Sequence, residues 1–95
     1  MKEKKHPKHI RAGNLVRFTS GLYVTDSNAI WIDRYGQRHV GRDILLAKGD
    51  VALVLETGLH VMSKTKSEYC IILFEDRKLK IDGAYWFKFE KIKQT

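Results

Sequence analysis

Two stretches decide the fold: Val51-Ala52-Leu53-Val54-Leu55 and Cys70-Ile71-Ile72-Leu73-Phe74. Every position in both is apolar, and each stretch is only five residues long. Strands that are apolar on both faces have both faces covered, so we expect these two to lie at the centre of a small, strongly bent barrel. Closing the sheet into a barrel would also remove most of its exposed edges.

Short β-rich segments separated by turn residues continue outward from this centre. The predicted strands are Leu15–Phe18, Leu22–Thr25, Ala29–Asp33, Val51–Glu56, Glu68–Phe74, Lys78–Ile81 and Tyr85–Lys91, with a loop at residues 26–28. Residues 38–48 fit either a short helical turn or an irregular strand. No stretch of ten residues shows a helical period, so the chain is predicted to be all-β. We expect one domain over residues 13–95, a barrel of about five to seven short antiparallel strands.

The C-terminal segment suggests a register for the last hairpin. Leu79 and Ile81 alternate with lysines, and aromatic residues alternate with charged ones after Tyr85. A three-residue loop over residues 82–84 would place Ile81 opposite Tyr85, so that both strands bury the same face. The side chains then expected inside are Leu79, Ile81, Phe87 and Phe89, and those expected outside are Lys80, Trp86 and Lys88.

Length and composition limit the class of protein. The 95 residues have a mass of 11.1 kDa, with 43% hydrophobic and 31% charged residues. A chain of this size builds one small core, which argues against a large enzyme with a deep cleft. No apolar run approaches the roughly 18 residues of a membrane span, and the start of the chain is too polar for a signal peptide. The single cysteine excludes an intramolecular disulfide and favours the cytoplasm.

More than half of the net charge of +7 lies at the N-terminus. The positive residues there are Lys2, Lys4, Lys5, Lys8 and Arg11, which with Glu3 give +4 over residues 1–11. The segment has one large apolar residue, Ile10, too little to order it by burial. We therefore predict a flexible basic arm over residues 1–12, either a contact for an acidic partner or a solvated end.

Catalytic and metal-binding patterns are poorly developed. Cys70 lies inside an apolar run, where a buried inert thiol is expected rather than a nucleophile. His6 and His9 have a spacing that fits one metal ion but have no further ligands beside them. The glycines match no nucleotide-binding fingerprint. The sequence therefore predicts a protein that is not an enzyme and needs no cofactor or metal.

Two segments resemble the KOW-type motif, in which apolar residues at alternate strand positions lie between two glycines. They are Gly13-Asn14-Leu15-Val16-Arg17-Phe18-Thr19-Ser20-Gly21 and residues 48–58. The run from Tyr69 to Ile92 is similar to the last three strands of Src-homology-3-like small barrels. This resemblance implies a small barrel, a fold whose members bind nucleic acid or protein. A short basic chain of this kind also resembles small accessory proteins of bacteriophages, which would place it in the host cytoplasm.

Positive residues recur beside aromatic ones, a combination that suits single-stranded nucleic acid because cations attract phosphates and aromatic faces stack on bases. The predicted contacts for RNA or single-stranded DNA, bound with low sequence specificity, are Lys2, Lys4, Lys5, Lys8, Arg11, Arg34, Tyr35, Arg38, Lys80, Trp86 and Lys88. The alternative is a protein-interaction module whose barrel surface and basic arm meet an acidic host or virion protein. A homodimer also fits this alternative.

Overall fold

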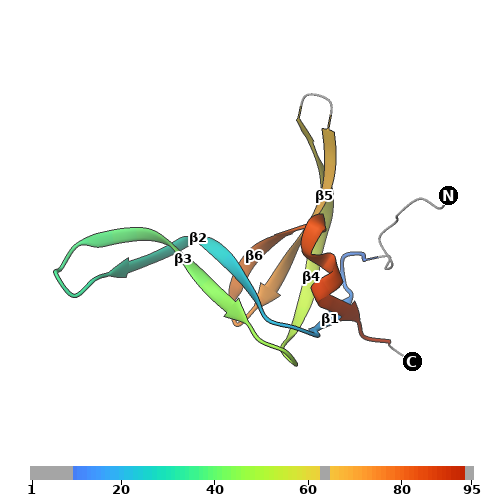
Figure 1. Ribbon diagram of the computed structural model, residues 1–95, viewed down its shortest axis with the longest axis horizontal. Helices are drawn as coiled ribbons and strands as arrows, with labels where there is room; N and C mark the ends of the chain where they lie inside the picture. Colours follow the sequence, from blue (N-terminus) through green and yellow to red (C-terminus); the bar gives the residue numbers. More distant parts are fainter. Residues whose placement is uncertain (1–9, 63–64, 94–95) are drawn as a thin grey trace.

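The computed structural model describes residues 10–62 and 65–93 (Figure 1). Its elements are β1 (Leu15–Phe18), β2 (Leu22–Ile32), β3 (Arg38–Leu46), β4 (Val51–Met62), β5 (Thr65–Phe74), β6 (Arg77–Asp82), the 3-10 helix η1 (Gly83–Lys88) and β7 (Phe89–Lys91). One antiparallel sheet has the order β6-β5-β4-β1-β7, and β2 and β3 form a second, two-stranded sheet. The predicted all-β class is confirmed. No helix within the described residues is long and apolar enough to cross a membrane.

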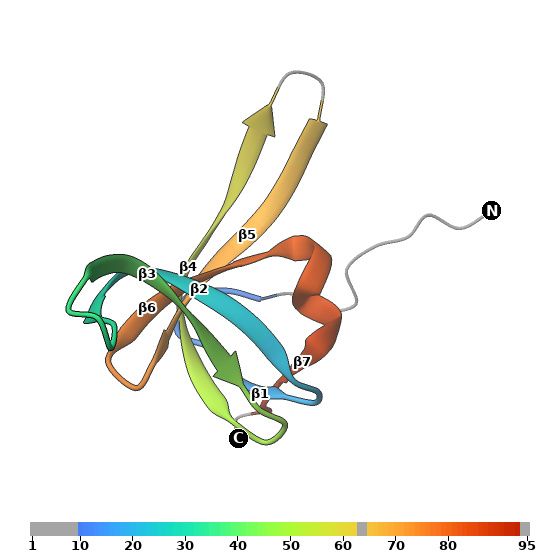
Figure 2. The ribbon, with the colours of Figure 1, turned by 60° about the vertical axis from the view of Figure 1, so that its left-hand side comes forward.

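The expected closure into a barrel is not found. No strand of one sheet pairs with a strand of the other within the described residues, and the sheets stay open. Instead, the inner half of the β2–β3 hairpin lies across the five-stranded sheet and covers it with Leu22, Val24 and Leu46. One sheet face is thus buried by packing rather than by closure. The remaining parts of the long hairpins extend away from the core (Figures 1 and 2).

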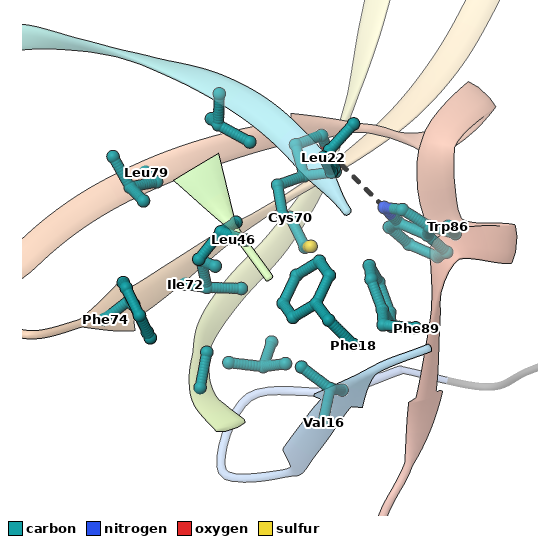
Figure 3. Close-up of a cluster of buried hydrophobic side chains, with 14 of the residues drawn as sticks. Val16, Phe18, Leu22, Leu46, Cys70, Ile72, Phe74, Leu79, Trp86 and Phe89 are labelled. Carbon is teal, nitrogen blue, oxygen red and sulfur yellow. Dashed lines mark hydrogen bonds between the residues drawn. The ribbon is translucent and has the colours of Figure 1, made fainter. Parts of the chain in front are cut away.

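The core lies between these layers and follows the alternation of each strand. In β1, Val16 and Phe18 are fully buried while Arg17 is exposed, and in β6 the buried residues Leu79 and Ile81 alternate with exposed lysines. The Phe18 ring meets the Phe89 ring edge-on, with 5.3 Å between centroids. Figure 3 shows the surrounding side chains, among them Cys70 and Ile72 of β5.

The strand predictions in the first half of the chain need two changes. Leu22–Thr25 and Ala29–Asp33 are parts of one strand, β2, and the predicted loop at 26–28 is a bulge within it, where the pairing shifts between Asp26 and Ile30. The ambiguous residues 38–48 contain strand β3 and no helix. Asp26 is 6% exposed and holds the bulge to β6, since Arg77 Nη1 donates to its Oδ2 over 3.1 Å.

The predicted final hairpin is wrong. Residues 83–88 form η1 rather than strand, and β6 pairs only with β5 among the described residues. Gly83, Trp86 and Phe89 are buried at a spacing of three, which is the period of a 3-10 helix. The faces expected for two of the aromatic residues are therefore exchanged: Trp86 is 3% exposed and Phe87 is 65% exposed. Leu79, Ile81 and Phe89 are buried and Lys80 is exposed, as predicted, whereas Lys88, expected outside, is half-buried at the end of η1.

Only the last three residues of the predicted flexible arm, residues 10–12, belong to the described part of the chain. Ile10, which the sequence placed in the arm, is 7% exposed and belongs to the hydrophobic core. Arg11 follows it at the surface, where its backbone N–H donates to Asn14 Oδ1 over 2.8 Å. The four lysines of the arm, Lys2, Lys4, Lys5 and Lys8, lie outside the described residues.

Candidate interaction site

The outer half of the β2–β3 hairpin, residues 29–42, is named here the distal ribbon. A turn over residues 33–37 closes it, and Asp33 organises that turn. Asp33 Oδ1 accepts the backbone N–H groups of Tyr35 and Gln37 over 2.8 and 2.9 Å. Its Oδ2 accepts from His39 Nε2 over 2.8 Å. The hydrogen bond from His39, followed by those from the turn, lowers the pKa of Asp33 below its ordinary 3.8.

One face of the distal ribbon is fixed by an aromatic pair. Trp31 lies opposite His39 in the ladder, and their rings stack with 4.4 Å between centroids. Trp31 Nε1 donates to the Gly41 carbonyl over 2.8 Å, and the Arg42 guanidinium lies 5.7 Å from the Trp31 ring centroid. Gly41 has φ of +95°, a conformation that favours glycine, at the point where β3 faces the bulge. Trp31 thus connects three residues of β3 on this face of the distal ribbon.

The other face of the distal ribbon is apolar and exposed. Ile30 lies directly opposite Val40, and Ile32 lies opposite Arg38, so these four side chains share one face. The exposed fractions of Ile30, Ile32 and Val40 are 58%, 60% and 65%. Three aliphatic side chains side by side on a projecting hairpin form an apolar strip, rather than the single exposed residues usual on a protein surface.

Three of the predicted site residues gather at the end of this ribbon. Tyr35 is 79% exposed at the turn, and the Arg34 guanidinium lies 5.7 Å from the centroid of its ring. Arg38 is exposed on the first position of β3. The turn therefore presents two arginines and a tyrosine beside the apolar strip.

The remaining predicted residues of the folded part lie elsewhere. Lys80 is on β6, with its Nζ 4.6 Å from the centroid of the Tyr69 ring, and Lys88 is on η1, with its Nζ 5.4 Å from the Phe87 ring. The distal ribbon and η1 extend on different sides of the core in Figure 1. Buried Trp86, whose Nε1 donates to the Ile81 carbonyl over 3.4 Å, offers no face for stacking. The predicted residues therefore do not form one continuous surface.

A groove of about 250 Å³ lies between β2, β6 and the start of η1. Tyr23 and Tyr85 line it and are 69% and 48% exposed, and Lys80 and Asp82 also contribute to its walls. Two aromatic rings therefore lie beside a predicted cation in this concave surface.

The described residues offer little for catalysis. They contain no group of three His, Cys, Asp or Glu side chains that could hold a metal ion. His6 and His9 lie outside the described part of the chain. Cys70 is buried, and this burial raises the pKa of its thiol from 9.0 to about 12, opposed only in part by a contact with Trp86. A thiol in this state is a poor nucleophile.

Sequence reasoning missed the apolar strip of the distal ribbon. The segment Ala29–Asp33 was correctly predicted as strand, but the sequence analysis did not predict that the face with Ile30 and Ile32 would be left uncovered. The informative signal was aliphatic residues on both sides of Trp31 together with Val40 after the turn. In this part of β2 both faces carry apolar side chains, so neither face is suited to contact with solvent.

Searches of protein-family models, of curated proteins and of solved structures find no match to this chain. The distal ribbon, with its apolar strip and arginine-bearing turn, is therefore identified as the candidate interaction site from its geometry.

Proposed function

We propose that this protein is a protein-interaction module and that the distal ribbon is its docking element. The observation that carries the proposal is the apolar strip of Ile30, Ile32 and Val40 on a projecting hairpin. Burying one such side chain fully contributes about 1.5–3 kcal/mol. With about three fifths of each exposed, covering all three contributes roughly 3–5 kcal/mol before the costs of association.

The chemistry of the strip favours protein over nucleic acid as its partner. Aliphatic side chains have no π-face on which a base can stack, and they gain nothing from hydrated phosphates. They gain from contact with another apolar protein surface. The ribbon is also preorganised by the Asp33 turn and the Trp31–His39 stack, which lowers the ordering cost of binding.

Site-specific photo-crosslinking in the native cell tests this proposal. A photoreactive residue at position 32 should give an adduct with protein that survives nuclease treatment. The same residue at exposed Glu75, in the β5–β6 turn, is the matched control and should give far less adduct. Equal crosslinking at both positions, or adducts that disappear with nuclease, would contradict docking through the ribbon.

A relationship to Src-homology-3-like folds, with the accompanying resemblance to bacteriophage accessory proteins, remains part of this proposal. Its support is the resemblance of the two glycine-bounded segments to the KOW-type motif together with the all-β class. A docking module of this size suits an accessory protein that attaches to a larger host or virion protein. The open sheets set the fold apart from a closed small barrel.

Single-stranded nucleic acid is the second candidate partner, and the groove between Tyr23 and Tyr85 favours it. Two exposed rings beside Lys80 can stack on a base and approach its phosphate, although Asp82 opposes the phosphate charge. Fluorescence anisotropy with labelled single-stranded RNA and DNA tests this candidate. If the five cations of residues 1–11 contact phosphates, deleting that segment should make the log–log salt slope shallower by roughly 3–4. Absence of binding at low salt would remove the candidate.

A further inference from the structure

The direction of the distal ribbon is set where the ribbon joins the core. None of residues 29–42 is buried, so packing in the core does not hold the ribbon itself. The inner half of the same hairpin is held there by Leu22, Val24 and Leu46. Figures 1 and 2 show the ribbon continuing outward from this packed half. The contacts at the junction therefore decide where the ribbon points.

The ladder between β2 and β3 is interrupted at this junction. Asp26 pairs with Arg42 and the next pair is Ile30 with Val40, so residues 27–29 lie opposite Gly41 alone. Gly41 has φ of +95°, and a Cβ added to it would meet no atom within 4 Å. A segment without ladder pairs bends more readily than the paired strands on either side of it. Residues 27–29 with Gly41 are named here the hinge.

A buried ion pair lies on the core side of the hinge. Asp26 is 6% exposed, and Arg77 Nη1, at the start of β6, donates to its Oδ2 over 3.1 Å. The other oxygen, Asp26 Oδ1, accepts the backbone N–H of the hinge residue Asn28 over 3.0 Å. One carboxylate thus connects the hinge to the five-stranded sheet.

Stability alone does not account for a charge at position 26. Leu22, Val24 and Asp26 are alternate residues on the buried face of β2, where a third aliphatic side chain would continue the core. A buried ion pair requires that both charges leave water, and replacing such a pair by apolar residues is often neutral or stabilising. Apolar contacts have no preferred direction, whereas a hydrogen bond fixes an angle as well as a distance. What the pair adds is therefore direction.

We propose that Asp26 and Arg77 are positioning residues, whose ion pair holds the hinge in one conformation and so sets the direction of the distal ribbon. This inference rests on the proposed docking function, for which it identifies two residues outside the docking element. Without the pair, the hinge bends and the ribbon samples a range of directions. A partner then binds only the fraction of molecules whose ribbon points correctly, which lowers its apparent affinity.

The surroundings of the pair leave room for this motion. An open cleft of about 520 Å³ lies between the hinge and the turn that joins β5 to β6. Its lining residues are Asp26, Asn28, Glu75, Asp76, Arg77 and Lys78. Glu75 and Asp76 are exposed in the turn just before Arg77 and compete with Asp26 for its guanidinium. The pair can therefore open without leaving the arginine away from a carboxylate.

Residual dipolar couplings, measured by NMR on the weakly aligned full chain, test the inference. Backbone N–H couplings of residues 30–32 and 38–40 report the direction of the ribbon relative to the five-stranded sheet. In the wild type, ribbon and sheet should fit one alignment tensor. The test variant is Asp26→Val with Arg77→Met, which removes both charges and keeps the net charge at +7. Its ribbon couplings should shrink and no longer fit the tensor of the sheet.

Two further variants separate position from stability. The matched control is Arg17→Met with Glu90→Val, which removes another arginine–carboxylate pair, 3.3 Å long between β1 and β7, and should behave as the wild type. Arg77→Lys keeps a cation opposite Asp26 and should retain the common tensor. Urea unfolding should give the test variant a midpoint equal to or above that of the wild type, because apolar residues replace a buried pair. A purely structural role predicts a lower midpoint instead.

Two results would overturn the role of Asp26 and Arg77. One is a wild-type ribbon whose couplings do not fit the tensor of the sheet; the other is a folded test variant whose ribbon still does. If the test variant does not fold, Asp26→Asn, which keeps the size of the side chain and removes its charge, gives the same readout with the same two outcomes.

Photo-crosslinking from position 32 connects this role to docking. Adducts with protein should be severalfold weaker in the test variant than in the Arg17→Met, Glu90→Val control. Equal adducts in the two would show that docking needs no fixed ribbon and would overturn that connection. If the wild type gives no protein adduct, the docking function itself fails, while the dipolar couplings still decide whether Asp26 and Arg77 direct the ribbon.

Discussion

Replacing Trp86 by alanine should destabilise the fold far more than replacing its neighbour Phe87. Trp86 is 3% exposed, and its ring packs toward Phe89 with 6.3 Å between centroids. Removing a buried aromatic side chain of this size costs about 3–5 kcal/mol, the lost burial together with the cavity left behind. The Nε1–H bond to Ile81 adds little, because 3.4 Å is long for a hydrogen bond.

Phe87 gives a much smaller expected value. Its side chain is 65% exposed, so only about a third of the roughly 1.5–3 kcal/mol for a fully buried ring is at stake. Phe87→Ala should therefore cost about 0.5–1 kcal/mol. A domain of this size has a free energy of unfolding of about 5–15 kcal/mol, so the Trp86 variant loses a large part of its stability and the Phe87 variant a small one.

Urea unfolding followed by far-UV circular dichroism measures both values. Trp86→Phe is the matched control, since it keeps an aromatic ring in the core and should fall between the two. An equal urea slope for wild type and variants would show that stability, rather than the cooperativity of unfolding, has changed. If Phe87→Ala loses as much stability as Trp86→Ala, the period of three in residues 83–89 is not what buries this segment, and the reasoning is refuted.

Two further predictions concern pH. The raised pKa of Cys70 means that its contribution to stability is fully present below pH 9 and is lost as the pH rises toward about 12; the urea midpoint should fall over this range in the wild type and less in Cys70→Ala, and an equal fall in both would contradict the assignment. The lowered pKa of Asp33 acts in the opposite sense, since the carboxylate stabilises the turn above pH 3.8 and loses this effect as the pH falls through its folded pKa; carbon NMR should place its midpoint below 3.8, and Asp33→Ala should speed amide exchange at Tyr35 and Gln37.

The strands that carry a strict alternation could be predicted from sequence. Leu15–Phe18 is found with the predicted bounds, and Leu79 and Ile81 are buried between exposed lysines. Here each residue type agrees with the face that the strand gives it, so local pattern and tertiary packing point to the same answer. The turn over residues 34–37 was predictable for a similar reason, because Asp33 and Gly36 suit its hydrogen bonds and its positive φ.

The candidate site was predictable only in part. Arg34, Tyr35 and Arg38 were expected at a surface, and the structure brings them together at one turn. The apolar strip beside them was not predicted, because burial of Ile30, Ile32 and Val40 depends on whether another layer covers that part of the hairpin. The aliphatic residues on both sides of Trp31 signal an apolar face, but this local pattern does not report whether a second layer covers it.

The sequence by itself determined that the chain is all-β, that turn residues separate most of its strands, and that its cysteine is buried. These follow from backbone preferences and side-chain type, which act over a few residues. Tertiary structure alone decided three features: the sheets stay open, residues 83–88 turn as a 3-10 helix, and two hairpins leave the core. Each depends on how many side chains compete for one small core. Trp86 and Phe89, three residues apart, both pack in the core. The outer halves of both hairpins extend beyond the core, and their aliphatic side chains stay exposed.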